Sequence, residues 1–328
     1  MEGSIKAHLA RRAPVGWAPR PYRPGDEPRV LPLYALAFQG LRRDDAYLRW
    51  KFRENPAGAR VMLAERADGE VFGLVAGLHT HAHVAGRPVR LSQVVDVMVD
   101  PGARRTLHRA GTFILLLARM IEAATVEDGA ALMFGLPNQD SDRVAQEVFG
   151  WRNIHQVTRV VRPLAGAPAP RVSWFARRRY VVRPLLDFGP ADTLWARCRG
   201  ALPLAVVRDA TYLTWRYTMC PRVRYHPFVA WDRWQDRPAG LFVLRLGWEG
   251  QPVAAVVDWL VPRGEAGPAA VLLAHAEGEA RRAGLAEVAA WFPPEPSEQR
   301  WFLTQGYTAE PTRYPLPTRA YAADLSLD

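Results

Sequence analysis

A repeated block of residues constrains this chain more than any other feature, because it indicates that the chain is a duplicated unit. Residues 43–52 read RDDAYLRWKF and residues 208–217 read RDATYLTWRY, and a proline follows each block at the same offset. Two further landmarks recur in the same order, VVD at 94–96 and 256–258, and FGW at 149–151 as QGY at 305–307. Landmarks that repeat in order at nearly constant separation are the signature of a tandem repeat. We therefore expect two copies of one fold.

A proline- and alanine-rich segment, residues 162–171 (RPLAGAPAPR), lies between the two copies. This composition is typical of a linker, and 328 residues suffice for two domains. We expect an N-terminal domain of residues 1–165 and a C-terminal domain of residues 172–328. Within each copy, hydrophobic periodicity and turn residues predict a strand, two helices, three strands, a helix, a strand, a helix and a strand. The predicted fold class is therefore α/β with a mixed sheet in each half.

The segment from Val94 to Gly111 is the strongest candidate for a ligand site. Residues 94–99 (VVDVMV) predict a buried strand, which Asp100-Pro101-Gly102 ends. A basic loop follows, and Gly111 and Thr112 then open a helix. A helix start suits phosphate, because its first N–H groups are unpaired and the helix dipole is positive there. The alternative is an ordinary strand–turn–helix with solvated arginines.

Composition narrows the choice of ligand and compartment. The net charge of +10 and the pI near 10.1 favour an anionic ligand such as a nucleotide, CoA, nucleic acid or a membrane surface. No apolar run has the length of a membrane-spanning helix, and the first residues lack the apolar core of a signal peptide. We expect Cys198 and Cys220 to be free thiols in a reducing cytoplasm.

Several motifs resemble those of the GNAT superfamily of acyl-CoA N-acyltransferases. Residues 97–101 (VMVDP) and Arg104 stand where that family has a V-x-V-x-P strand and a pyrophosphate loop of type R-x-x-G-x-G/A. Asn138 matches an asparagine that often follows the next strand, and Gly150-Trp151 match the G-F or G-W after the next helix. The predicted order of elements also matches. Nearly the whole chain therefore resembles a tandem pair of GNAT domains.

The resemblance implies transfer of an acyl group, most simply acetyl, from acetyl-CoA or another acyl-CoA to a small-molecule or peptide amine. Main-chain N–H groups near residues 97–99 would polarise the thioester carbonyl, and arginines of the basic loop would bind phosphate. No membrane partner is expected. The residues expected to contact the cofactor are Val97, Met98, Val99, Arg104, Arg105, Arg109, Ala110, Gly111, Thr112 and Asn138.

Three departures from the family pattern bear on activity. The loop of residues 104–111 lacks the usual early glycines, although main-chain N–H groups can still bind a pyrophosphate. The tyrosine that often serves the family as general acid is replaced by Gln146 in the first copy and Phe302 in the second. In the second copy, residues 261–268 (VPRGEAGP) place an acid and two prolines in the phosphate loop. We therefore expect the second copy to be cofactor-free.

Asp96 is the candidate catalytic residue, because it is a carboxylate within an apolar strand. A buried carboxylate can act as a general base toward an ammonium acceptor. Asp96 recurs as Asp258 in the copy expected to be inactive, however, and this favours a structural role. Trp50 and Trp215 of the repeated blocks are interpreted as core anchors, with the lining of an acceptor pocket as the alternative.

Three histidines, His79, His81 and His83, alternate along a predicted strand and so share one face. Such a face can in principle hold a metal or supply a base. No carboxylate or cysteine accompanies them in the sequence, so the favoured interpretation is a solvated strand end and no metal is predicted.

Two alternative functions stay open at this point. One is a tandem-GNAT aminoacyl transferase that uses aminoacyl-tRNA, which the basic pI allows; nucleic acid is expected only under this alternative. The other is a degenerate, non-catalytic module that binds CoA or a partner protein. The missing tyrosine and the altered loops favour the second alternative.

Overall fold

The computed structural model describes residues 16–38, 43–102, 109–248, 250–293, 297–323 and 325. The chain forms two compact units. Unit 1 contains Met1–Ala82, Pro88–Ile154 and Leu316–Asp328, and unit 2 contains His83–Arg87 and His155–Pro315. These units do not coincide with the two copies of the repeat, so "first copy" and "second copy" below refer to the sequence alone.

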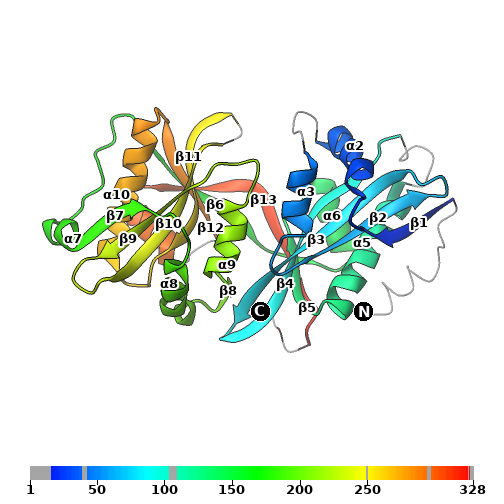
Figure 1. Ribbon diagram of the computed structural model, residues 1–328, viewed down its shortest axis with the longest axis horizontal. Coiled ribbons are helices and arrows are strands. Elements are labelled where there is room, and N and C mark those ends of the chain that lie inside the picture. Colours follow the sequence, from blue (N-terminus) through cyan, green and yellow to red (C-terminus); the bar gives the residue numbers. More distant parts are fainter. Residues whose placement is uncertain are drawn as a thin grey trace. The chain divides into compact units, whose positions relative to one another are not determined.

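The first copy contains the predicted order of strands and helices (Figure 1). Its elements are β1 (Trp17–Pro21), α2 (Glu27–Ala37), α3 (Asp45–Phe52), β2 (Ala59–Arg66), β3 (Val71–Val84), β4 (Arg87–Val99), α5 (Arg109–Glu122) with a π-helical end η1 (Ala123–Glu127), β5 (Ala130–Gly135), α6 (Gln139–Glu147) and β6 (Arg152–Pro163).

The second copy repeats this order with two short insertions, α7 and β8. Its elements are α7 (Trp174–Arg179), β7 (Tyr180–Pro184), α8 (Pro190–Cys198) with η2 (Arg199–Ala201), β8 (Leu204–Val206), α9 (Ala210–Leu213) with a π-helical end η3 (Thr214–Thr218), β9 (His226–Asp232), β10 (Arg237–Trp248), β11 (Gln251–Leu260), α10 (Ala266–Arg282), β12 (Glu287–Phe292), α11 (Ser297–Thr304) and β13 (Thr308–Ala320).

Both units contain the same mixed sheet. The strand order is β1-β2-β3-β4-β5-β13 in unit 1 and β7-β9-β10-β11-β12-β6 in unit 2. The pair β4–β5 and the equivalent pair β11–β12 are parallel. The first two pairs of each sheet and the pair at its far end are antiparallel. The predicted duplicated α/β fold is confirmed.

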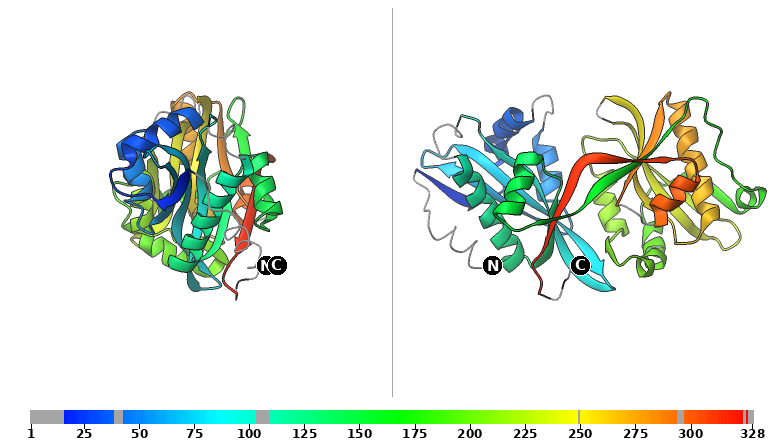
Figure 2. Two further views of the ribbon diagram at one scale, coloured as in Figure 1. Left: turned by 90° about the vertical axis from the view of Figure 1, so that its right-hand side faces the viewer. Right: turned by 180° about the vertical axis from the view of Figure 1, so that it is seen from behind.

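The last strand of each copy completes the sheet of the other. Strand β6 pairs with β12, with Val161 opposite Ala289, and β13 pairs with β5, with Thr318 opposite Phe134. Each of these strands therefore starts in one unit and ends in the other (Figure 2). The compact units consequently do not follow the boundaries expected at residues 165 and 172. The expected boundaries assign β6 to the N-terminal domain and β13 to the C-terminal domain. Backbone pairing instead assigns most of β6 to unit 2 and the end of β13 to unit 1.

Helices cover both faces of the sheet in unit 1. Leu74 of β3 packs with α2 and α3, whereas its neighbour Val75 packs with α5 and α6. Successive residues of a strand point to opposite faces, so these two helix pairs lie on opposite sides of the sheet. Unit 2 has the same arrangement, with α8 and α9 on one core cluster and α10 on the other. Among the described residues, no helix is long and apolar enough to cross a membrane.

The repeated block begins a helix in both copies. The Asp44 carboxylate accepts the backbone N–H of Tyr47 at 2.8 Å, and Asp209 accepts that of Tyr212 at 2.8 Å. Aspartate is a preferred N-cap because its oxygen satisfies one of the unpaired first-turn N–H groups. The tryptophans of the two blocks are buried, as expected of core anchors.

Candidate active site

A cavity of about 210 Å³ opens in unit 1 where β4 and β5 stop pairing. The last pair in the register is Val94 opposite Gly135, and β4 continues to Val99 without β5 beside it. Side chains from two helices close the cavity, and most of its lining is apolar. The lining residues are Phe38, Val94–Val97, Phe113, Leu117, Gly135–Asn138, Ser141, Ala145, Trp151 and Pro317. Pro317 belongs to β13, so the second copy contributes to the wall of this cavity.

Asp96 lies at a bend of β4 beside the cavity. Its φ is +52°, a left-handed value that few residues other than glycine adopt within a strand. The side chains that follow still alternate, because Val97 and Val99 pack on the α5 side while Met98 packs on the α2 side. The backbone irregularity therefore falls at the point where the two parallel strands separate.

The Asp96 carboxylate is held by two buried partners. The Tyr34 hydroxyl donates to Oδ2 at 2.6 Å, and the Lys51 ammonium forms an ion pair with the same oxygen. Burial, together with the Asp96 charge, raises the pKa of Tyr34 well above its usual value, so the phenol stays protonated and donates. No described residue bonds to Oδ1 of Asp96. One carboxylate thus ties α2 and α3 to β4 and keeps one oxygen available.

In the second copy, Asp258 is also bound by a tyrosine hydroxyl and a basic side chain, but these come from other positions in the sequence. The Tyr217 hydroxyl lies 3.0 Å from Oδ2, and Arg208 Nε lies 3.1 Å from Oδ1. In the aligned blocks these residues correspond to Phe52 and Arg43, not to Tyr34 and Lys51. A tie between strand and helices is therefore common to both copies. Asp96 lines the cavity of unit 1, and Asp258 is not among the lining residues of the two cavities described below.

The expected phosphate end of the site is described only in part. Arg104 and Arg105 lie outside the described residues, and for Arg109 and Ala110 the structure gives only their place at the start of α5. Gly111 and Thr112 follow in the first turn of that helix, with Thr112 buried.

Asn138 lines the cavity and also begins α6. Its Oδ1 accepts the N–H of Ser141 at 2.9 Å, as an N-cap. The residue named from the sequence for pantetheine contact is therefore at the cavity, with its carbonyl oxygen already bonded. Contact with the cofactor itself stays a prediction.

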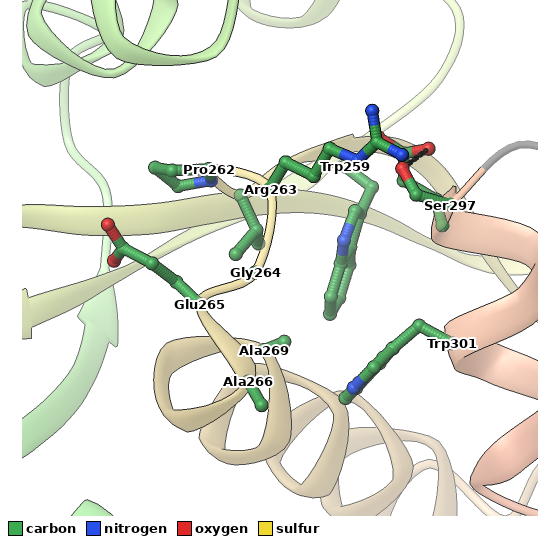
Figure 3. A pocket seen from close by; sticks show the side chains of 11 residues that line it. Trp259, Pro262, Arg263, Gly264, Glu265, Ala266, Ala269, Ser297 and Trp301 are labelled. Atoms are coloured by element: carbon green, nitrogen blue, oxygen red, sulfur yellow. Dashed lines mark hydrogen bonds between the residues drawn. The ribbon is translucent and has the colours of Figure 1, made fainter. Parts of the chain in front are cut away.

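Two indole rings occupy the corresponding position in the second copy. Trp259 and Trp301 stand at the positions of Val97 and Ala145 in the first copy. Their rings stack with centroids 5.8 Å apart (Figure 3). In the loop before α10, Glu265 forms an ion pair with Arg197. The second copy thus has two bulky indoles where the first copy has the smaller side chains of Val97 and Ala145.

The histidines are divided by burial. His79 and His83 are buried, whereas His81 is exposed, so a solvated strand end is wrong for two of the three. His79 Nε2 lies 3.0 Å from the Asp128 carboxylate, which also pairs with Arg60. Burial lowers the pKa of His79 below its usual value. Among the described residues, no group of three or more His, Cys, Asp or Glu could hold a metal ion.

Sequence reasoning missed Tyr34 and Lys51. A signal for Lys51 existed, because it lies between the aromatic residues Trp50 and Phe52 on a helix that had to be buried. A buried cation needs an opposite charge, and Asp96 is the carboxylate in the apolar strand. The free state of Cys198 and Cys220, by contrast, is confirmed.

Comparison with known proteins identifies the fold. Residues 18–153 match the family model of the acetyltransferase (GNAT) domain. No curated protein matches the sequence. Residues 18–153 are thus similar to a GNAT domain, and solved structures titled as GNAT proteins share the fold of the chain.

Solved structures share the fold at low sequence identity. A probable N-acyltransferase from Enterococcus faecalis V583 gives a TM-score of 0.70 at 10% identity, over 93% of this chain and 73% of that one. A tandem GNAT protein from the clavulanic acid biosynthesis pathway gives 0.60 at 20% identity, over 94% and 100%. A GCN5-related N-acetyltransferase from Kribbella flavida gives 0.65 at 17% identity, over 95% and 73%. Such a fold supports acyl transfer in general terms.

Proposed function

We propose that this GNAT protein transfers an acyl group, most simply acetyl, from acyl-CoA to a primary amine, and that it does so in unit 1. The observation that carries the proposal is the cavity beside β4 in unit 1, which Val97 and Ala145 line at positions where the second copy has two stacked indoles. An apolar slot beside a bent strand suits a flexible pantetheine arm. The start of α5 suits its phosphates.

The cofactor fits the residues that are present. Main-chain groups of Val97, Met98 and Val99 would meet the thioester, and Asn138 would meet the pantetheine amides. Gly111, Thr112 and the basic residues Arg104, Arg105 and Arg109, with Ala110, would hold the phosphates. When bound, acyl-CoA supplies the activated acyl group.

We assign to Asp96 the binding and deprotonation of the acceptor amine. Lys51 and Tyr34 occupy Oδ2, so the other oxygen, Oδ1, receives the ammonium and takes its proton directly or through a water. The amine nitrogen then bonds to the acyl carbon as the carbon–sulfur bond breaks, and the second proton lost from nitrogen passes to water or to the departing sulfur. A thiol with an ordinary pKa near 8.5 leaves as thiolate without much help, so the absence of a tyrosine at Gln146 is compatible with turnover.

Filling the slot of unit 1 tests the proposal directly. Ala145→Trp and Val97→Trp introduce the side chains that the second copy has at these positions. Each should lower acetyl-CoA affinity at least about tenfold, because the indole would occupy the volume of the ligand. Calorimetry measures affinity, and thermal unfolding without ligand shows whether the variant still folds.

Trp259→Val in the second copy is the matched control and should leave acetyl-CoA affinity unchanged. If folded Ala145→Trp and Val97→Trp bind acetyl-CoA as the parent does, the cofactor does not use this cavity. If the parent binds no acyl-CoA at all, an aminoacyl-tRNA donor becomes the better interpretation.

A non-catalytic acyl-CoA-binding module is the second candidate. The ion pair with Lys51 already occupies one oxygen of Asp96, and Gln146 cannot act as an acid. Acetyl-CoA binding without release of CoA, across a broad panel of amines assayed with a thiol reagent, would favour this candidate.

A further inference from the structure

Unit 2 contains two adjoining cavities that the proposed reaction does not use. They measure about 150 Å³ and 280 Å³. Both lie past the point where β11 and β12 stop pairing, at Val256 opposite Ala290. Because five lining residues are common to both, the cavities are neighbours; these are Trp259, Val261, Arg263, Ser297 and Glu298. Together they reach the size range of small-molecule sites.

The shape and charge of this place do not suit a second acyl-CoA. The stacked rings of Trp259 and Trp301 stand where the pantetheine slot would be. The Glu265 carboxylate precedes α10, where a pyrophosphate would require donors and positive charge. A different ligand is therefore required.

Two opposite charges border both cavities. Arg263 is exposed and has no hydrogen bond or ion pair to any described residue. Its side chain extends toward Ser297 at the start of α11 (Figure 3). Glu298 is half-buried and accepts a hydrogen bond from the Ser297 hydroxyl at 3.0 Å. Within the described part of the chain, Glu298 has no ion-pair partner. Arg263 is solvated, whereas a half-buried carboxylate such as Glu298 gains from an opposite charge. A ligand with a carboxylate and an ammonium would complement both side chains.

The remaining walls are apolar, with one fixed cation. Trp259, Trp301 and Phe292 supply aromatic surface. Arg208 lines the larger cavity and is anchored by Asp258, with 3.1 Å between Nε and Oδ1. Cys198 also lines this cavity, and burial raises the pKa of its thiol to about 12. A protonated thiol is a poor nucleophile, so the site is suited to binding and not to covalent chemistry.

We propose that unit 2 binds a small amphoteric molecule, an α-amino acid with an apolar side chain. Its carboxylate pairs with Arg263, supported by Arg208, and its ammonium pairs with Glu298. Its side chain lies against the aromatic wall. The second copy is then a ligand-binding domain of its own, whatever the first copy transfers.

Calorimetry on the full chain tests this with L-phenylalanine, 3-phenylpropionate and phenethylamine as probes. L-phenylalanine should bind most tightly. Each analogue lacks one charged group and should bind at least about tenfold more weakly, as expected when one charge-assisted bond is lost.

Arg263→Gln and Glu298→Gln should each lower the affinity for L-phenylalanine about tenfold. In Arg263→Gln, phenethylamine should bind about as well as L-phenylalanine. Arg300→Gln removes an exposed arginine of the same helix α11 and should change nothing. Ala145→Trp in unit 1 should also leave L-phenylalanine affinity unchanged, which separates this site from the acyl-transfer site.

Absence of heat with both L-phenylalanine and L-leucine at millimolar concentration would overturn the proposal. Equal affinity for all three phenyl probes would also overturn it, and so would binding that neither Arg263→Gln nor Glu298→Gln weakens.

Discussion

At the scale of single residues, Asp96 combines two roles that the sequence presented as alternatives. It anchors β4 to α2 and α3 through Tyr34 and Lys51, and it borders the cavity with an oxygen, Oδ1, to which no described residue bonds. The equivalent Asp258 has only the anchoring role in the described residues. A substitution of Asp258 therefore measures the effect of losing the anchoring role alone, for comparison with the same substitution of Asp96.

Asp96→Asn should lower both stability and turnover. Loss of one partner of a buried pair leaves the Lys51 charge uncompensated, at a cost of roughly 3 kcal/mol or more in the free energy of unfolding. Loss of the base should lower kcat about 100-fold. Urea unfolding and CoA release with a saturating amine measure the two effects.

Asp258→Asn is the comparison for that experiment. It should cost less stability, because Arg208 is 31% exposed and can regain water, and it should leave kcat unchanged. Equal losses of kcat in the two variants would contradict a chemical role for Asp96.

His79 makes the stability of unit 1 dependent on pH. Burial lowers its pKa in the folded chain below the ordinary 6.5, so the unfolded chain binds a proton more readily. The contribution is complete above about pH 6.5 and declines as the pH falls through that value toward the folded pKa, by at most about 1.4 kcal/mol per pH unit. His155, His226 and His275 shift in the same direction.

His79→Gln should therefore lose less stability than the parent between pH 7.5 and pH 5.5 in urea unfolding. His81→Gln, at an exposed position, should behave as the parent does. If the free energy of unfolding fell with pH equally in the parent and in His79→Gln, the acid sensitivity would belong to the other histidines.

Below about pH 4 a separate loss of stability is expected. Burial opposes ionisation of Asp128, but hydrogen bonds from Arg60 and His79 outweigh it and lower the pKa of Asp128.

At the scale of elements, helix α5 lies unusually close to β3. A Cβ added at Gly77 would lie 2.6 Å from Ser92 Oγ and 2.9 Å from Met120 Sδ, and one at Gly73 would lie 3.1 Å from Leu116 Cδ1. These glycines let the helix that borders the cavity pack against the sheet. The position of α5, and with it the slot, depends on residues that touch no ligand.

Gly77→Ala should lower the free energy of unfolding by about 1–3 kcal/mol, as overpacking of a core does. Gly200→Ala is the control, because nothing lies within 4 Å of its added Cβ. Chemical denaturation of both variants checks the prediction. A Gly77→Ala protein as stable as the parent would show that Ser92 and Met120 move aside freely.

Much at this scale could be predicted from the sequence. The order of elements follows from local periodicity, and the Asp44 and Asp209 caps follow from the repeated block. The partners of Asp96 could not be predicted, because Tyr34 and Lys51 reach it only through the packing of α2 and α3. The aligned copies show that Trp259 and Trp301 replace Val97 and Ala145. The consequence of this replacement could not be predicted, because the sequence does not show that Val97 and Ala145 line a cavity.

At the scale of the whole molecule, the exchange of β6 and β13 could not be predicted from the sequence. The two copies are homologous in fold, so β5 and β12 present equivalent edges. Hydrophobic pattern alone does not decide which final strand pairs with which edge. Length of chain and the position of the linker suggest two separable domains, whereas Thr318 of the second copy pairs with Phe134 of the first.

A chain cut at the linker should therefore fold poorly. Residues 1–165 lack β13, which pairs with β5 and supplies Pro317 to the cavity. We expect this fragment to be largely unfolded or aggregated, and to regain structure and acetyl-CoA binding when residues 166–328 are supplied in trans. Circular dichroism and calorimetry of the fragment, alone and mixed, check this. A monomeric, folded and fully binding 1–165 fragment would show the exchange to be dispensable.

The exchanged strands also set an order of events during synthesis. The edge of β5 leaves the ribosome well before its partner, residues 318–320 of β13. An unpaired edge invites pairing with other chains. The nascent first half must wait, with an open edge, until the residues between Phe134 and Thr318 have been translated. Slow elongation or premature termination should therefore harm this protein more than a tandem repeat with self-contained halves. A stop codon near residue 315 would release a chain with both halves nearly complete and the first sheet still open.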